Sequence, residues 1–505
     1  MKLYKHLLVA LGVSLATVSC DDYLDVNDTP NSPTQNLVQP DLLLAGALED
    51  PYRTPLSVQM NTTGNALVNH WAGDINNFAG GFQDEFTLNF TTTYQNGIWN
   101  ELYRSCNTFQ AIINDPTEDY DNHKAIAKVM KAYYFQYIVD LYGDVPYFEA
   151  LQGGDNLTPV YDDAETIYRD LVVQCNEAIA LINNSNSEDA VVGIEDIIFD
   201  GDMSQWIAFA NTVKLKLYVR QMELAETNSE TKSYLQSQFS DLDKNFIATD
   251  ALINPGYTNV VGKQNPYYAS YGFDVEGNPT SNYEFIVPSD YSAQFMKGQP
   301  TEDGVNTNIF DIRVQRYYRV LPSAGEVVGV VQGADNVSSP PALSELGPGL
   351  IISSSQDGYI MLAAESYLLQ AEAVQRGYMS GNARDLFQQA IRESYRSLGL
   401  TLAQADEYIT NSNSVNLIGY DGSSNKIEAI ITQKWIALCG RFGMEAYIEY
   451  NRTGYPDIPL PIIAQEDRRP VRFLYPASEI STNAANVPTQ AGTAVFNDPI
   501  FWDVN

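Results

Sequence analysis

The chain has 505 residues, of which 63 are acidic and 29 basic, and its formal net charge at pH 7 is −34. This acid excess would repel the phosphate backbone of nucleic acids and anionic lipid surfaces, and it excludes nucleic acid as a partner. It favours a neutral or cationic ligand, and the chain is long enough to bury a large core.

The N-terminus has the features of a lipoprotein signal peptide. Lys2 and Lys5 precede an apolar run from Leu7 to Val18, and a small residue comes directly before Cys20. The run is too short for a bilayer core, which needs about 20 residues, but it fits a cleaved export signal. We predict that residues 1–19 are removed, that Cys20 becomes the lipidated N-terminus, and that the net charge changes from −34 to −36. The alternative is a cytosolic protein with an apolar first turn.

The N-terminal half then shows a series of amphipathic helices. Apolar residues recur at steps of three and four, which is typical of helices with one buried face. Asp162 and Asp163 suit the N-terminus of the second helix, and Trp99 is expected in the core. The three strongest stripes are Ile126, Val129, Met130, Tyr133, Tyr137 and Leu141; then Ala164, Ile167, Leu171, Cys175, Ala178 and Ile182; and then Trp206, Ala210, Val213 and Leu217.

The stretch from about residue 225 to 356 differs in composition. Pro, Gly, Asn, Ser and Tyr are interspersed there, and helical stripes are short or missing. Eight tyrosines argue against a disordered linker, so we expect long ordered loops, which usually carry function. Val327–Gln332 and the later Arg472–Tyr475 could form short strands, but the pattern does not say whether they pair.

Helical stripes return in the C-terminal part. Two helices joined by a turn at Gly377–Gly381 are predicted to form a hairpin, and one further long helix ends at the breaker cluster Asn451–Pro456. Helix pairs of this length with small residues at close contacts are typical of tetratricopeptide-type stacks, so the predicted fold is mainly α. The stripes are Ile360, Ala364, Tyr367, Ala371 and Val374; Leu386, Phe387, Ala390, Ile391 and Leu398; and Ile427, Ile430, Ile431, Trp435, Leu438, Phe442 and Ala446.

Motifs for catalysis or cofactor binding are missing from the sequence. Cys106, Cys175 and Cys439 have no metal-ligand spacing and are expected to be small buried hydrophobic residues. His70 and His123 are expected to cap or pack rather than to catalyse. There is no HExxH or phosphate-binding loop, and no pair of acids is singled out as a glycosidase pair. We therefore predict no catalytic residue, no metal and no cofactor.

Two aromatic, polar loops are the candidate ligand site, and we expect their rings to converge, exposed to solvent, on one concave surface. A neutral glycan is held by flat rings that stack on its C–H faces and by amides and carboxylates that bind its hydroxyls. The alternative for each single ring is packing in the core. The predicted ligand-binding residues are Trp71, Asp74, Asn76, Asn77, Phe78, Phe82 and Gln83 in one loop, and Tyr267, Tyr268 and Tyr271 in the other.

Several segments together resemble the SusD/RagB-type outer-membrane lipoproteins, and the resemblance covers essentially the whole chain. The opening at Asp25–Asn31 and the Arg-Thr-Gly-Tyr-Pro sequence at Arg452–Pro456 resemble a divergent branch of that family. The other segments that carry the resemblance are Cys20–Asp25, Lys131–Phe135, Asp140–Tyr147, Trp206–Leu217, Ala363–Glu365, Gln370–Ala373, Gln433–Trp435, Glu445–Tyr447 and Arg472–Pro476.

The resemblance implies a monomeric body of four tetratricopeptide-like helix pairs with an irregular ligand-binding half. It implies one domain over 20–505, with a scaffold at about 41–224 and 357–450, an irregular insertion at about 225–356 and a tail at 451–505. Such proteins are lipid-anchored on the cell exterior and pass oligosaccharides to a TonB-dependent, SusC-like porin in the outer membrane. A peptide or another nutrient is the alternative ligand, and a purely structural helical adaptor is the third hypothesis.

Overall fold

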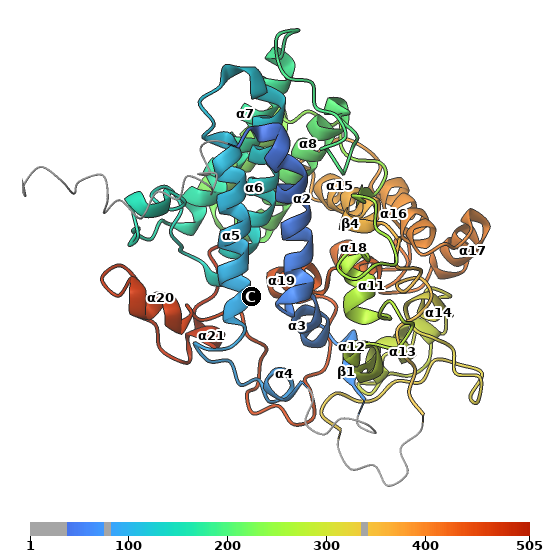
Figure 1. The fold of residues 1–505 in the computed structure, drawn as a ribbon. Coiled ribbons are helices and arrows are strands. Elements are labelled where there is room, and N and C mark those ends of the chain that lie inside the picture. The colour runs from blue at the N-terminus through green and yellow to red at the C-terminus, as the bar shows by residue number, and fades with distance from the viewer. Residues whose placement is uncertain (1–37, 75–81, 335–341) are drawn as a thin grey trace, which may run out of the picture.

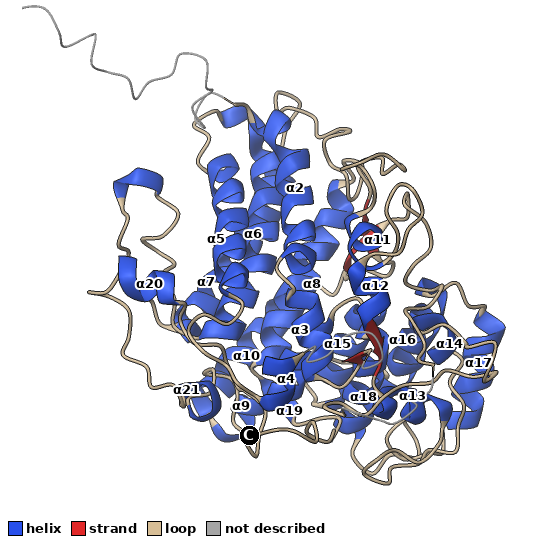
Figure 2. Cartoon of the chain, turned by 60° about the horizontal axis from the view of Figure 1, so that its bottom comes forward, coloured by secondary structure: helices blue, strands red, loops and turns tan. Residues whose placement is uncertain are grey.

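The computed structural model describes residues 38–74, 82–334 and 342–505, and helices are its main regular structure (Figures 1 and 2). The predicted signal peptide and the predicted lipidation site Cys20 lie outside the described residues. Across the described ranges, no helix is both long enough and apolar enough to span a bilayer. The prediction of a mainly helical fold with a large loop-rich part is confirmed.

The long helices of the N-terminal half lie side by side (Figure 1). Helix α6 packs against both α5 and α7, and α2 packs against α5. Every apolar position predicted between Ile126 and Leu141 is buried, and Asp163 caps α7 by accepting a hydrogen bond from the backbone N–H of Thr166 at 2.8 Å. The helices are α2 (Pro40–Ser57), α3 (Met60–Leu67), α4 (Gln83–Thr87), α5 (Asn96–Ile113), α6 (Asp121–Tyr142), α7 (Ala164–Asn184) and α8 (Met203–Arg220), with short 3₁₀ turns at Glu118–Tyr120 and Gly153–Asp155.

The C-terminal helices include the predicted hairpin. Helices α15 and α16 pack on each other, and α18 packs on α15. Ala364 and Ala371 are fully buried, as expected for small residues at close helix contacts. The helices are α15 (Ala363–Gln375), α16 (Ala383–Ser397), α17 (Leu402–Ser412), α18 (Lys426–Leu438), α19 (Gly443–Thr453), α20 (Ala477–Thr482) and α21 (Ala494–Asn497).

The prediction of one long helix over the stripe Ile427–Ala446 is wrong, because the chain breaks between α18 and α19. Gly440 has a φ of +79°, which ends the helical path. Side chains from α3 hold the break: Asn61 Nδ2 donates to the Gly440 carbonyl at 2.9 Å, and Asn65 Oδ1 accepts from the Gly440 N–H at 2.9 Å. The apolar stripe continues through the break because α18 and α19 are both buried along most of their length.

The middle of the chain is irregular, as predicted, but it contains one helix of 13 residues that was not predicted, α10 (Ser229–Asp241). Asn228 caps α10, and Leu235 and Phe239 give it only a narrow buried face. The other helices there are short: α9 (Met222–Thr227), α11 (Pro266–Tyr271), α12 (Ser281–Phe285), α13 (Asp290–Lys297) and α14 (Val314–Tyr317).

Two antiparallel two-stranded sheets tie distant segments together. Strand β1 (Trp71–Gly73) pairs with β3 (Ile286–Pro288), with Trp71 opposite Pro288. Strand β2 (Ala251–Ile253) pairs with β4 (Gly358–Met361). The possible strand at 327–332 contributes a single bridge, between Val330 and Ser289, and no strand forms at 472–475.

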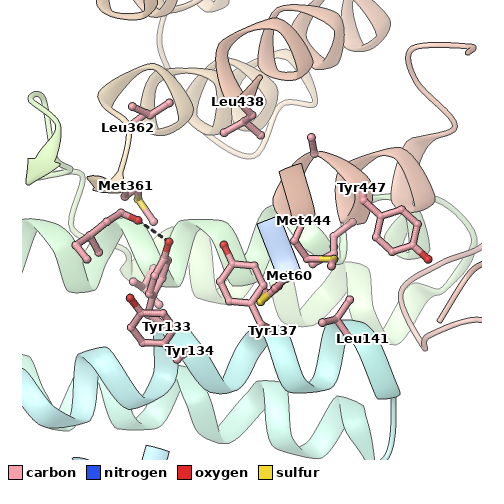
Figure 3. Packing of buried hydrophobic residues seen from close by; sticks show 14 of the residues in the cluster. Met60, Tyr133, Tyr134, Tyr137, Leu141, Met361, Leu362, Leu438, Met444 and Tyr447 are labelled. Carbon is pink, nitrogen blue, oxygen red and sulfur yellow. Dashed lines mark hydrogen bonds between the residues drawn. The ribbon is translucent and has the colours of Figure 1, made fainter. Parts of the chain in front are cut away.

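The core lies between the two groups of long helices (Figure 3). Tyr137 on α6 lies beside Met60 of α3 and faces Met444 of α19, whereas Tyr133 points toward the segment of Met361, where its hydroxyl donates to the Ile360 carbonyl at 2.7 Å. The three cysteines Cys106, Cys175 and Cys439 are buried and unpaired, which agrees with their predicted packing role.

A network of charged side chains lies inside the core, between helices α6, α8, α15, α18 and α19. Lys216 Nζ lies 2.8 Å from Glu445 Oε2 and 3.1 Å from Glu365 Oε1. Arg220 Nη2 lies 2.9 Å from Glu445 Oε1. We call this set the buried ion network; its members are Asp140, Lys216, Arg220, Glu365, Glu372, Lys434, Glu445, Glu449 and Arg452.

The segment that leaves α3, residues 66–71, is buried and bonded to side chains along its whole length. Each of its six carbonyls accepts a hydrogen bond from a side chain far away in the sequence, which satisfies groups that a helix end leaves free. The donors are Gln332 to Ala66 and Trp71, Arg469 to Leu67, Trp435 to Val68, Ser289 to Asn69, and Ser292 and Tyr318 to His70.

Candidate functional site

The two predicted binding segments meet in space although they lie about 200 residues apart in the chain. Trp71 of β1 and Tyr271 of α11 form an edge-to-face pair with ring centroids 5.4 Å apart. The predicted convergence of the loops is therefore present in the fold.

The expectation that these rings are exposed is wrong for Trp71 and Tyr271, because both have an exposed fraction of 0 %. The Tyr271 hydroxyl lies 2.7 Å from Thr62 Oγ1, and α11 packs against α2. Helices α2 and α3 thus supply the packing partners of this pair. The two rings offer no free face for stacking and act as packing residues.

Three more of the predicted ligand-binding residues, Asp74, Phe82 and Tyr267, are also covered. Tyr267 is buried, with its hydroxyl donating to the Gly440 carbonyl at 2.9 Å. Asp74 is buried, and Phe82 packs on Phe86 and Phe285 with ring centroids 5.4 Å and 5.0 Å away. Gln83 is exposed at the start of α4. Asn76, Asn77 and Phe78 lie outside the described residues.

Tyr268 is partly exposed and belongs to a group of three rings. Its ring centroid lies 6.2 Å from that of Phe273, and the Phe273 centroid lies 4.8 Å from that of Tyr283. All three rings are partly exposed. We call Tyr268, Phe273 and Tyr283 the aromatic surface cluster.

The turn between Phe273 and Tyr283 explains how the cluster forms. The Asp274 N–H donates to the Asn278 carbonyl at 2.9 Å, and the Thr280 N–H donates to the Gly272 carbonyl at 2.9 Å. Phe273 and Tyr283 were not among the predicted site residues. The signal that could have found them is the Gly277–Asn278 turn, which folds the chain back between two aromatic residues.

The surroundings of the cluster are polar and mainly acidic. Arg319 forms an ion pair with Glu345 next to Tyr283. Burial, followed by the charge of Glu345, raises the pKa of Tyr283, so its hydroxyl keeps its proton at neutral pH and can donate a hydrogen bond. Asn278 side-chain and backbone donors lower the pKa of the exposed Asp274 carboxyl, which therefore stays ionised.

His70 and His123 each contact other side chains inside the fold through a ring contact or a hydrogen bond. His70 lies 4.7 Å from the Trp435 ring, its Nδ1 is 3.0 Å from Asn65 Oδ1, and burial lowers its pKa to about 3. His123 Nε2 lies 3.1 Å from Glu195 Oε1. In the part of the chain that the structure describes, no group of three or more His, Cys, Asp or Glu residues could hold a metal ion.

The stacked helix pairs make this a tetratricopeptide-like helical protein. The sequence predicts this fold, and the solved structures that the chain resembles confirm it. The chain belongs to the SusD-like family described as "starch-binding associating with outer membrane", whose model matches residues 31–476. The predicted family membership is therefore confirmed.

Solved structures of SusD homologues superpose over most of the chain. A chitin-binding SusD homologue from Flavobacterium johnsoniae is 22% identical, with a TM-score of 0.71 over 92% of this chain and 99% of that one. A SusD homologue from Parabacteroides distasonis is 19% identical, with a TM-score of 0.73 over 93% and 98%. A SusD-like protein from Bacteroides thetaiotaomicron is 20% identical, with a TM-score of 0.72 over 92% and 99%. No curated protein matches this chain significantly in sequence.

Proposed function

We propose that this protein captures neutral oligosaccharides on the outside of the outer membrane through the aromatic surface cluster. The observation that carries the proposal is the set of three adjoining, partly exposed rings on the loop-rich half of a family described as starch-binding. Flat rings stack on the C–H faces of sugars, and the Tyr283 hydroxyl and nearby polar groups suit sugar hydroxyls.

Cys20 anchors the protein through its lipid in this proposal, and the bound glycan passes to a TonB-dependent, SusC-like transporter. The protein binds rather than cleaves its ligand. The family description, which places its members at the outer membrane, supports this location.

The geometry favours a glycan over a peptide. Peptides are often held by pairing with a free strand edge, whereas each strand in the described part of the chain has only three or four residues. A cluster of rings offers ring faces for stacking on a sugar, rather than the backbone N–H and C=O groups with which a peptide would pair. The ligands to test first are malto-oligosaccharides and chito-oligosaccharides, because the family description names starch and the Flavobacterium johnsoniae homologue is described as chitin-binding.

The test is calorimetric titration of a soluble form that begins at Asp21 against a panel of oligosaccharides, with peptides of similar length as the comparison. We expect Tyr268→Ala and Tyr283→Ala each to weaken glycan binding about fivefold, because one stacked ring is worth about 1 kcal/mol. Phe310→Ala is the control, since Phe310 is a ring outside the cluster with an exposed fraction of 51%. Unchanged affinity in both tyrosine variants would reject the assigned site, and binding of peptides alone would reject the glycan.

A further inference from the structure

A cleft separate from the aromatic surface cluster opens where the N-terminal helices meet the loop-rich half. The space between atoms in and in front of the cleft is about 750 Å³, part of which is open solvent at the mouth. Leu56 of α2, Tyr359 of β4 and Phe442 lie at partly exposed positions of its wall, and Tyr134 and Tyr137 of α6 lie deeper. Figure 3 shows Tyr137 together with Met60 and Met444, which also line it.

The wall of this cleft consists mainly of ring faces and apolar side chains. Tyr52, Tyr133 and Tyr267 add three more rings to those of Tyr134 and Tyr137. Aromatic rings and methionine sulfurs make favourable contacts with another ring. The cleft therefore suits a flat, apolar ligand.

Three polar side chains of the wall are already engaged within the protein. Asn61 donates to the Gly440 carbonyl and accepts from the Gly443 N–H. Gln356 accepts from the backbone N–H groups of Ile352 and Ser353 and donates to the Leu350 carbonyl. Glu445 belongs to the buried ion network, where Lys216, Arg220 and Lys434 surround its carboxylate.

Tyr134 is in a different position from these three side chains. Its hydroxyl has no hydrogen-bond partner among the described residues, and its oxygen is not one of the sealed, unpartnered polar atoms of the core. Burial raises the pKa of Tyr134, so the hydroxyl keeps its proton and can both donate and accept. The Tyr134 hydroxyl is thus free for a ligand in the deep part of the cleft.

We propose that this cleft binds a small aromatic ring that carries a single hydroxyl, with the ring between the tyrosine and methionine side chains and its hydroxyl on Tyr134. A sugar is a poor fit, because each of its hydroxyls would lose water without gaining a partner. The site is independent of the glycan site, since it shares no residue with the aromatic surface cluster.

The test uses p-cresol and toluene, which differ by one hydroxyl, as probes of the soluble chain from Asp21. We expect saturation-transfer NMR and calorimetry to show binding of p-cresol. Leu56→Trp places a larger side chain at the cleft wall and should weaken p-cresol binding at least about tenfold by filling the space. Leu402→Trp is the matched control, because Leu402 lies on α17, outside the cleft, with an exposed fraction of 61%.

Tyr134→Phe tests the polar contact separately. It removes one oxygen and should weaken p-cresol binding about threefold to tenfold while leaving toluene binding unchanged. Melting temperature and glycan affinity should stay the same in Tyr134→Phe and Leu56→Trp, which separates this site from the glycan site and from misfolding. Failure of p-cresol to bind, or equal binding to Leu56→Trp and the unmodified chain, would overturn the proposal and leave a cleft that holds only water.

Discussion

At the scale of single residues, the buried ion network explains why several segments that carry the family resemblance have charged residues within otherwise apolar helices. Glu365, Glu372, Glu445 and Arg452 all belong to segments that carry the family resemblance, and all belong to the buried ion network. Charges are buried in proteins only when they are paired. These motif residues therefore hold helices together.

Removing one partner of this network should be costly. Glu445→Gln would remove the carboxylate that Lys216, Arg220 and Lys434 share inside the core, and we expect it to lower the free energy of unfolding by about 3–5 kcal/mol. Glu101→Gln removes one of the two carboxylate partners of Arg104 at the surface, and it should change stability by less than about 1 kcal/mol. Urea unfolding of both variants measures the difference, and equal losses would contradict this account.

The same carboxylate makes stability depend on pH. Burial alone would raise the pKa of Glu445, but Arg220, Lys216 and Lys434 outweigh it and lower the pKa to about 2. A carboxyl whose pKa is lower in the folded than in the unfolded state stabilises the fold above its unfolded value, here 4.5, and this contribution is lost as the pH falls toward 2. Urea midpoints measured from pH 5 to pH 2.5 should fall steeply for the unmodified chain and less steeply for Glu445→Gln.

At the scale of elements, the crossing of α3 and α19 depends on glycine. A Cβ atom at Gly64 would lie 2.1 Å from the backbone nitrogen of Met444, and one at Gly443 would lie 2.3 Å from the backbone nitrogen of Asn65. Neither backbone can move away freely, because Asn61 and Asn65 bind the turn between α18 and α19. The two helices therefore touch through their backbones.

This contact gives a matched pair of substitutions. Gly64→Ala should force α3 and α19 apart and cost about 1–3 kcal/mol or more of unfolding free energy. Gly46→Ala, in the middle of α2, meets nothing within 4 Å, and it should stabilise the protein by about 0.5–1 kcal/mol because alanine favours a helix. Thermal unfolding of both variants measures these two changes. An unchanged melting temperature in Gly64→Ala would show that the crossing tolerates a methyl group.

The helices show where sequence reasoning works and where it stops. The stripe from Ile126 to Leu141 predicted a buried face correctly, because a helical period is a local property of the chain. The break at Gly440 and the burial of Trp71 depend on segments hundreds of residues away, such as α3 and α11. Sequence alone could bring the two aromatic loops forward as candidates, but it could not tell which rings face the core.

At the scale of the whole molecule, the loop-rich part contributes to one common core. The main buried cluster includes Leu102 from α5, Tyr271 and Tyr318 from the middle of the chain, and Trp502 near its end. Trp502 donates its indole N–H to Asp140 Oδ1 at 2.9 Å, which connects the tail to the buried ion network. This continuity supports the single domain that we propose for residues 20–505.

The side-chain hydrogen bonds along residues 66–71 have a consequence for how the protein melts. Their donors range from Ser289 to Arg469, so releasing the middle of the chain or the tail on its own would leave bare carbonyls inside an otherwise intact bundle. Partial melting is therefore penalised. We expect a single endotherm in differential scanning calorimetry, with equal van't Hoff and calorimetric enthalpies, whereas two resolved peaks would mean that the parts melt independently.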